Sequence, residues 1–348
     1  MRKQRGISLV EIMVSLLAGL ILTAGVIQIY AANKQTYRVA DASARMQENA
    51  RFAMEQLGRD LRMAGFQGCA GSVRTIVDTL NDTSSFLYNF GVAIQGFEAT
   101  GASVWTPAVD SSITSPLGGM DIVAVRGVFE DGVAITGQPD NAADCPGASE
   151  TADLKIGNTT GINVDDTVIA GNCTRASIFQ ITGVSGGTLA NPPITISHIL
   201  TPQPPPLPAP PGNGTADLGA CYAGNGRLFH ITTRVFYIRN NTAGIPALYR
   251  KDGAGSAEEL VEGVEDMQIL YGVDTDGDGS VNQYLRANDV SNWGLVTGIR
   301  ISLLLQSVEN NITTAPQPYF FNGTTVTPAD RRLRRAFTTT IAVRNQLP

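Results

Sequence analysis

The chain has 348 residues, which gives room for about two domains and a buried core. Hydrophobic residues make up 43% of it and charged residues only 16%, against roughly 25% in ordinary soluble domains. The net charge of −6 argues against a general nucleic-acid binder, and only two histidines, His198 and His230, are present for histidine-based catalysis or metal binding. We therefore expect a protein that is not an enzyme.

The N-terminal segment is basic and then turns apolar around one acidic side chain. Arg2, Lys3 and Arg5 come first, Glu11 follows, and residues 12–33 carry no charge. As a helix, this uncharged stretch is roughly 33 Å long, enough to cross a bilayer with the basic residues on the cytoplasmic side. A cleaved secretory signal peptide is the alternative. The length of the apolar run and an unpaired carboxylate within it argue against that alternative.

Residues 6–11, with the sequence GISLVE, resemble the class III signal of type IV prepilins and pseudopilins. The resemblance implies that residues 1–6 are a leader removed by a prepilin peptidase after Gly6, and that the mature chain begins at an N-methylated Ile7. It also implies that Glu11 pairs with the terminal amine of a neighbouring subunit during filament assembly. Major pilins commonly have Phe at the position of Ile7 and Pro at that of Gln28, so the resemblance favours a minor pilin.

Residues 7–33 are the predicted transmembrane half of one long helix, and residues 34–65 are its amphipathic half beyond the membrane. Six apolar residues recur in the second half at helical spacings of three and four: Met46, Ala50, Ala53, Leu57, Leu61 and Ala64. Gly65 is the predicted C-terminal stop. The stripe predicts that this half packs on a sheet.

After residue 66 the sequence changes to short alternating runs that predict antiparallel strands. We expect a variable β-rich region over 66–225, with a proline-rich loop at 202–212, and a C-terminal sheet over 226–348. The expected strands are 121–128, 167–170, 177–184, 194–200, 227–239, 267–273, 296–305 and 337–344, with a helical turn at 258–265. The predicted fold is α+β and pilin-like, with the long helix packed on a mainly antiparallel sheet. The basic run 331–335 is interpreted as a solvated strand edge or a subunit-docking face.

The last third also resembles one family of minor pilins. Residues 247–250 (ALYR), 259–273 (ELVEGVEDMQILYGV), 296–304 and 335–345 are similar to the C-terminal part of the PilW family. The resemblance implies a tip complex that primes pilus assembly and supports motility, adhesion or DNA uptake. The implied partners are other minor pilins, the major pilin, the prepilin peptidase and the inner-membrane assembly platform. The implied location is the inner membrane of a Gram-negative bacterium, with the C-terminal domain in the periplasm, and then the pilus tip.

The loop 274–285 begins with the pattern D-x-D-x-D-G, which is the first half of an EF-hand-type calcium loop. Three carboxylates on one turn repel each other unless a cation lies between them. The candidate ligands are Asp274, Asp276, Asp278, the Ser280 carbonyl and Asn282. Leu285 stands where the closing glutamate would be. The pattern predicts structural Ca²⁺, and a solvated turn is the alternative.

Four cysteines are widely spaced and form no CxxC pair: Cys69, Cys145, Cys173 and Cys221. This spacing predicts two disulfides in an oxidising compartment, with three pairings open, and four buried thiols as the alternative. The G-x-S-x-G pattern at 183–187 is followed by no helical sequence, so we interpret it as a hairpin turn. Two alternative functions remain, a J-type minor pseudopilin of type II secretion and a membrane-anchored calcium-dependent adhesin or hydrolase.

Overall fold

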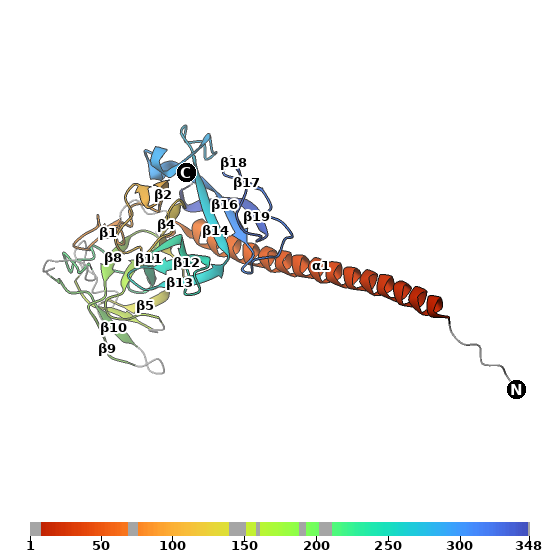
Figure 1. Cartoon of the computed structure of the whole chain (residues 1–348). Coiled ribbons are helices and arrows are strands. Elements are labelled where there is room, and N and C mark those ends of the chain that lie inside the picture. Colours follow the sequence, from red (N-terminus) through yellow and green to blue (C-terminus); the bar gives the residue numbers. More distant parts are fainter. Residues whose placement is uncertain are drawn as a thin grey trace.

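The computed structural model describes residues 8–68, 76–138, 151–157, 161–187, 193–201 and 211–346. One helix of 55 residues, α1 (Leu9–Met63), leaves a β-rich domain and projects from it as a rod (Figure 1). The strands of the domain are paired almost entirely antiparallel. The expected α+β class, with a long N-terminal helix on a mainly antiparallel β domain, is confirmed.

Helix α1 has two halves with different surroundings. Its N-terminal half is exposed on all sides, whereas the C-terminal half is buried at the predicted apolar positions Met46, Ala50, Ala53, Leu57 and Leu61. The helix ends where expected, because Gly65 follows it with a φ of +74°, a left-handed conformation that glycine adopts without strain.

Within the described residues the domain forms strands β1 (Ile76–Asp78), β2 (Ile94–Gly101), β3 (Val104–Thr106), β4 (Ile122–Val128), β5 (Val133–Gly137), β6 (Leu154–Ile156), β7 (Thr167–Gly171), β8 (Ala176–Gln180), β9 (Gly183–Ser185), β10 (Ile194–Ser197), β11 (Arg227–Asn240), β12 (Pro246–Asp252), β13 (Ala257–Glu262), β14 (Val264–Val273), β15 (Gln283–Leu285), β16 (Val296–Gln306), β17 (Tyr319–Phe321), β18 (Thr324–Val326) and β19 (Arg334–Ala342). The same described residues also form the short 3-10 turns η3 (Ala287–Asp289), η4 (Trp293–Leu295) and η5 (Arg344–Gln346).

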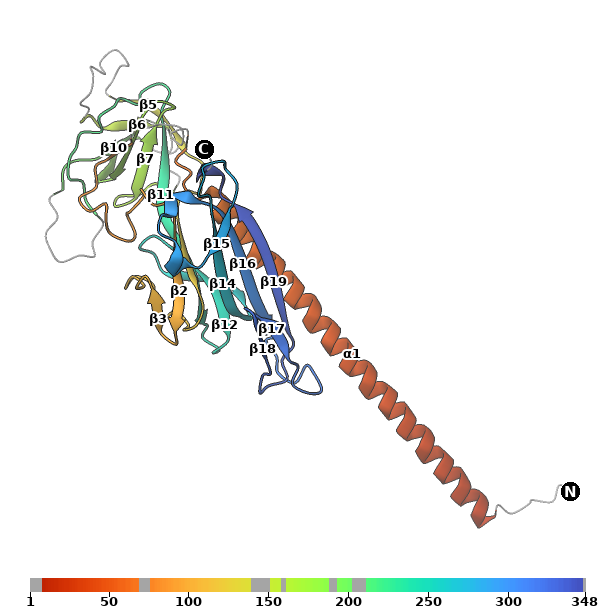
Figure 2. The same cartoon turned by 90° about the horizontal axis from the view of Figure 1, so that it is seen from above.

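Strand β11 is the link between the two parts of the domain. Its first residues pair with β5 and β7 in the part far from the helix, and its second half pairs with β4 and β12 near the helix. Strands from the regions 66–225 and 226–348 therefore share one sheet of 13 strands. A second sheet has the order β15-β14-β16-β19 and lies beside α1 (Figure 2).

The main core lies where the C-terminal half of α1 packs on β4, β13, β16 and β19. Tyr271 of β14 is fully buried there and lies against Gly96 of β2. A Cβ at Gly96 would come within 2.2 Å of the Tyr271 hydroxyl, so only glycine fits beneath this ring. Trp293 packs edge-on to Tyr271, with ring centroids 4.8 Å apart.

One sequence prediction in this region is wrong. Residues 258–265 form β13 and the start of β14 instead of a helical turn. Strand β13 pairs with β12, and Gly263 turns the chain between β13 and β14 with a φ of +78°. Val261 and Val264 are buried on either side of this glycine. Pairing with β12 and burial of these valines favour the strand over the local helical tendency of the glutamates.

Candidate functional site

The N-terminal turn of α1 holds one carboxylate at the start of the exposed rod. The backbone N–H of Ser8, which precedes the helix, donates to Glu11 Oε2 at 3.3 Å. This is the reciprocal half of a capping box, and it places the negative charge at the positive end of the helix dipole. The predicted cleavage site at Gly6 and Ile7 lies outside the described residues. Glu11 is exposed, so its carboxylate is accessible to a cation from another molecule.

The exposed half of α1 is apolar around its whole circumference. Leu9, Leu20, Leu22, Ile29 and their large apolar neighbours are each more than 45% exposed, and by length and composition this helix could cross a membrane. A helix that is apolar on every side needs lipid or other apolar helices around it. The rod is therefore the part of the molecule that the domain itself does not cover.

A buried ion-pair network fixes the other half of α1 to the sheet. Asp60 is 2% exposed, and its two carboxylate oxygens lie 3.1 and 3.2 Å from Arg234 Nη1 on β11. Arg234 Nε also donates to Asp252 Oδ2 at 2.8 Å, and Arg250 Nη1 lies 4.0 Å from Asp60 Oδ2. Burial raises the pKa of Asp60, although the charges of Arg234 and Arg250 oppose this shift. Sequence analysis did not identify this network, because Asp60 and Arg234 are 174 residues apart.

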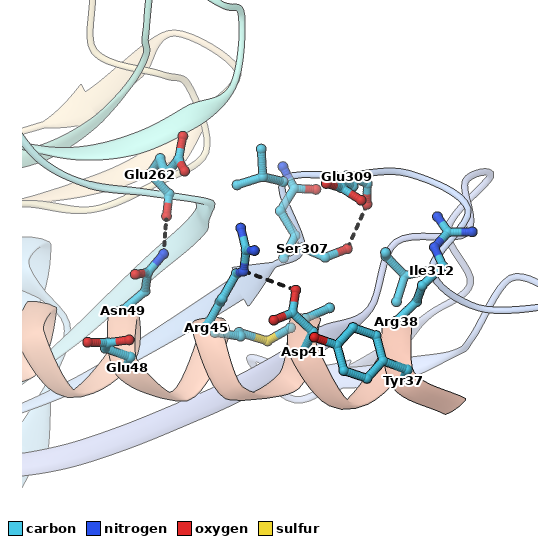
Figure 3. Close-up of a pocket in the computed structure, with 14 residues that line it drawn as sticks. Tyr37, Arg38, Asp41, Arg45, Glu48, Asn49, Glu262, Ser307, Glu309 and Ile312 are labelled. Atoms are coloured by element: carbon cyan, nitrogen blue, oxygen red, sulfur yellow. Dashed lines mark hydrogen bonds and ion pairs between the residues drawn. The ribbon is translucent and has the colours of Figure 1, made fainter. Parts of the chain in front are cut away.

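A groove of about 240 Å³ lies where α1 leaves the domain (Figure 3). The side-chain amide of Gln35 donates to the Ile312 carbonyl, and Asn49 Nδ2 donates to the Glu262 carbonyl at 3.3 Å. On the helix surface between them, Arg45 pairs with Asp41 at 3.1 Å. The Gln35 contact holds the loop after β16 against the helix, and the Asn49 contact holds the end of β13. The part of α1 that leads to the rod is therefore supported from the side.

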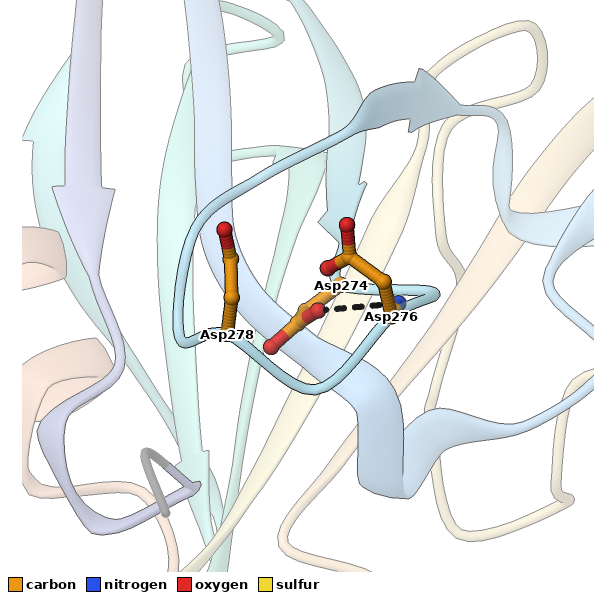
Figure 4. Close-up of side chains that lie close together, drawn as sticks. All are labelled: Asp274, Asp276 and Asp278. Carbon is orange, nitrogen blue, oxygen red and sulfur yellow. Dashed lines mark hydrogen bonds between the residues drawn. The ribbon is translucent and has the colours of Figure 1, made fainter.

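The aspartates of the loop after β14 come together as predicted (Figure 4). Oxygen atoms of Asp274, Asp276 and Asp278 lie within 4.8 Å of one another. Asp274 is buried and accepts from the backbone N–H groups of Gly277 and Gly279 at 2.7 and 2.8 Å. Burial opposes ionisation of Asp274, but these donors hold its pKa below the ordinary value.

The remaining candidate ligands only partly fit a calcium site. Asn282 Oδ1 accepts from the Thr275 N–H at 2.6 Å, and Asn282 Nδ2 donates to Asp276 Oδ2 at 3.2 Å. The Ser280 N–H donates to Asp278 at 2.7 Å. Leu285 lies in β15, and its side chain has no oxygen to close the shell. The described loop thus brings three carboxylates together, whereas Ca²⁺ takes six to eight oxygen ligands.

Two of the cysteines lie in described parts of the chain. Cys173 and Cys221 are disulfide-bonded in the structure. Cys69 and Cys145 lie outside the described residues, and so does most of the proline-rich loop 202–212. The choice among the three pairings therefore stays open.

The basic run 331–335 divides between two environments. Arg334 is almost buried and binds Glu265 at 2.6 Å and Asp330 at 2.6 Å. Its hydrogen bonds lower the pKa of Asp330 to about 2. Arg335 is exposed and lies over the Phe337 ring. Side chains alternate between the two faces of a strand, so Arg334 and Arg335 lie on opposite faces of β19. The expected strand 337–344 began too late to include them, and a strand starting at Arg334 would have predicted this separation.

A second buried acidic group, Asp121, directly precedes β4 and lies between the two sheets. Asp121 is 2% exposed and accepts from the Ala99 and Ile269 N–H groups at 3.1 and 2.8 Å, so it joins β2 to β14. Burial raises its pKa to about 7, and the nearby Glu98 adds to the shift. Sequence analysis identified neither Asp60 nor Asp121, because neither residue lies in a recognisable motif.

Comparison with known proteins gives two matches to family models. The model described as type IV pilus-assembly protein W matches residues 235–345, and that of the prokaryotic N-terminal methylation motif matches residues 1–27. Among solved structures, a type IV-like pilin from Thermus thermophilus is 10% identical, with a TM-score of 0.34 over 87% of this chain and 98% of that one. No curated protein matches the chain. The chain thus carries a PilW-family domain behind the N-terminal methylation motif of a class III prepilin signal.

Proposed function

We propose that the protein is a minor pilin that helps to start type IV pilus assembly within a tip complex. The exposed apolar half of α1 carries this proposal, because a rod without a partner in its own domain must be covered by lipid and then by other helices. The PilW match over residues 235–345 supports the same role. The protein acts as a structural subunit and not as an enzyme.

Assembly proceeds in this proposal by packing of α1 against the helices of other minor pilins and the major pilin. A prepilin peptidase first removes residues 1–6 in the inner membrane, with the β domain in the periplasm, and the assembly platform then extracts the subunit. Glu11 is exposed in the first turn, where it can meet the Ile7 amine of a neighbour. In a low-dielectric bundle this ion pair selects one axial register of the two helices.

The test replaces Glu11 and a matched acid on the same helix. Glu11→Ala should leave processing and folding intact but reduce piliation and incorporation into sheared pili, measured by immunoblotting. Glu55→Ala is the control, because Glu55 is exposed on the half of α1 that lies on the domain. Normal piliation with Glu11→Ala would contradict the proposed register.

Processing is tested separately at the cleavage site. We expect Gly6→Asp to block removal of the leader, so that only full-length chain accumulates. Intact-mass and N-terminal analysis of the membrane-extracted protein measures this directly. A mature chain starting at N-methylated Ile7 in the unchanged protein supports the proposal, whereas an intact Met1 or a cut near Gly25 contradicts it.

Two alternatives have distinct outcomes in a deletion strain. Loss of secreted proteins with normal pili would indicate a J-type pseudopilin. Function that persists without the pilus assembly genes would indicate an anchored calcium-dependent adhesin or hydrolase. Loss of pili alone agrees with the minor pilin.

We also propose that the Asp-rich loop binds structural Ca²⁺, supported by the three carboxylates within 4.8 Å. Calorimetric titration of the full chain with CaCl₂ should show binding that Asp276→Asn weakens and Asp131→Asn, an exposed control, does not. No binding heat, or equal binding by both variants, would indicate the solvated turn.

A further inference from the structure

Strand β19 is a free edge of the sheet β15-β14-β16-β19. One side of β19 pairs with β16 along its whole length, from Arg334 opposite Gln306 to Ala342 opposite Gly298. Within the described residues no strand pairs with its other side. Most of its residues are exposed or half-buried. The strand thus presents a row of backbone N–H and C=O groups that can pair with another chain.

The free side of β19 borders a groove of about 530 Å³ between the strand and α1. Figure 2 shows β14, β16 and β19 side by side, with α1 running past β19. Met54 of α1 and Phe337 of β19 are partly buried and give the groove an apolar lining. Thr339 continues the strand side of it. A strand added to β19 would have one row of side chains facing this helix.

The charges that line the groove have one sign. Arg51 comes from α1 and Arg335 from β19, and no carboxylate lines the groove. Neither guanidinium forms an ion pair with any residue that the structure describes. By contrast, Arg334 on the opposite face of β19 is held by Glu265 and Asp330. Two unpaired arginines beside a free strand edge favour an occupant with negative charge.

We propose that β19 binds an extended, acidic polypeptide segment of a partner protein by strand addition. The backbone of the segment pairs with β19, and its acidic side chains on the helix-facing row meet Arg51 and Arg335. The other row lies beside Ala336, Thr338 and Thr340, where small or β-branched side chains fit. This surface is separate from the rod and Glu11, so the inference does not depend on the proposed function.

The experiment uses the full chain in detergent micelles and a fluorescent nine-residue peptide of alternating Glu and Val. A peptide with Lys in place of Glu is the matched probe. Fluorescence anisotropy should show that the Glu peptide binds more tightly than the Lys peptide and that added salt weakens binding. Charge reversal in Arg51→Glu with Arg335→Glu should weaken binding of the Glu peptide by at least about tenfold. Arg300→Glu, exposed on the neighbouring strand, should leave it unchanged.

Hydrogen exchange supplies a readout of the backbone. Bound Glu peptide should slow exchange of amides in 334–342 more than elsewhere. Equal binding of both peptides, no effect of the double reversal, or protection elsewhere would overturn the proposal. Self-association of the full chain that the same reversal abolishes would instead make a second copy the occupant and overturn the partner assigned here.

Discussion

The buried network around Asp60 predicts a definite order of destabilisation. Asp60 is 2% exposed in the unchanged protein, and Arg234→Ala leaves its carboxylate with Arg250, at 4.0 Å, as the remaining cation of the network. Removing one partner of a buried pair costs about 3–5 kcal/mol. Asp60→Ala should cost less, about 1.5–3 kcal/mol, because it removes charged hydrogen bonds while Arg234 keeps Asp252 at 2.8 Å.

A surface pair on the same helix serves as the control. Arg45 and Asp41 have side chains 73% and 45% exposed, so Arg45→Ala should change stability by only about 0–0.5 kcal/mol. Urea unfolding of the full chain at constant detergent, followed by the fluorescence of Trp105 and Trp293, gives the three free energies of unfolding. Equal losses for Arg234→Ala and Arg45→Ala, or a larger loss for Asp60→Ala than for Arg234→Ala, would refute the reasoning.

Two further predictions concern the packing between β2, β4 and β14. Burial raises the pKa of Asp121 to about 7, above its unfolded value, so the folded state gains stability as pH falls. When the pH is lowered from 8 to 5.5, the free energy of unfolding measured in urea should rise by about 2 kcal/mol, and it should rise less in Asp121→Asn. An equal rise in this variant would contradict the assignment of the pH dependence to Asp121. Gly96→Ala should cost about 1–3 kcal/mol, because its Cβ would meet the Tyr271 ring, whereas a Cβ at Gly91 would meet only the Asn89 side chain at 3.6 Å, an ordinary contact. Similar urea midpoints for these two glycine variants would show that Tyr271 can move.

The elements that sequence analysis predicted are those whose pattern is local. The helix has its apolar stripe at Met46, Ala50 and Leu57 within a few turns, and Gly65 marks its end. The Asp-rich turn is likewise encoded in consecutive residues. Long strands such as β11 and β16 are rich in β-branched and other apolar residues over ten or more positions. Short strands such as β1, β6 and β15 have three residues each, too few for a period to be recognised.

The predicted helical turn at 258–265 was wrong because the structure of this segment depends on its pairing partner, strand β12, and not on local sequence signals alone. Glutamates in that segment favour a helix locally, but β12 offers a strand edge to pair with, and only the folded sheet reveals it. The partner of Asp60 was likewise invisible, because nothing near Asp60 in the chain identifies Arg234. Tertiary pairing and burial, not local propensity, decide both features.

The domain holds helix α1 at several points along its length. Asp60 near its end is tied to β11 by Arg234, Asn49 is tied to Glu262, and Gln35 near its middle is tied to the loop at Ile312. These three attachments lie along the helix, so the domain resists both rotation and axial sliding of α1. A lateral force or an axial pull on the exposed rod is therefore passed to the sheet through several contacts instead of one. The assembly proposed above, in which the subunit is extracted from a membrane by its helix, needs this property, because the domain must follow the rod without unfolding.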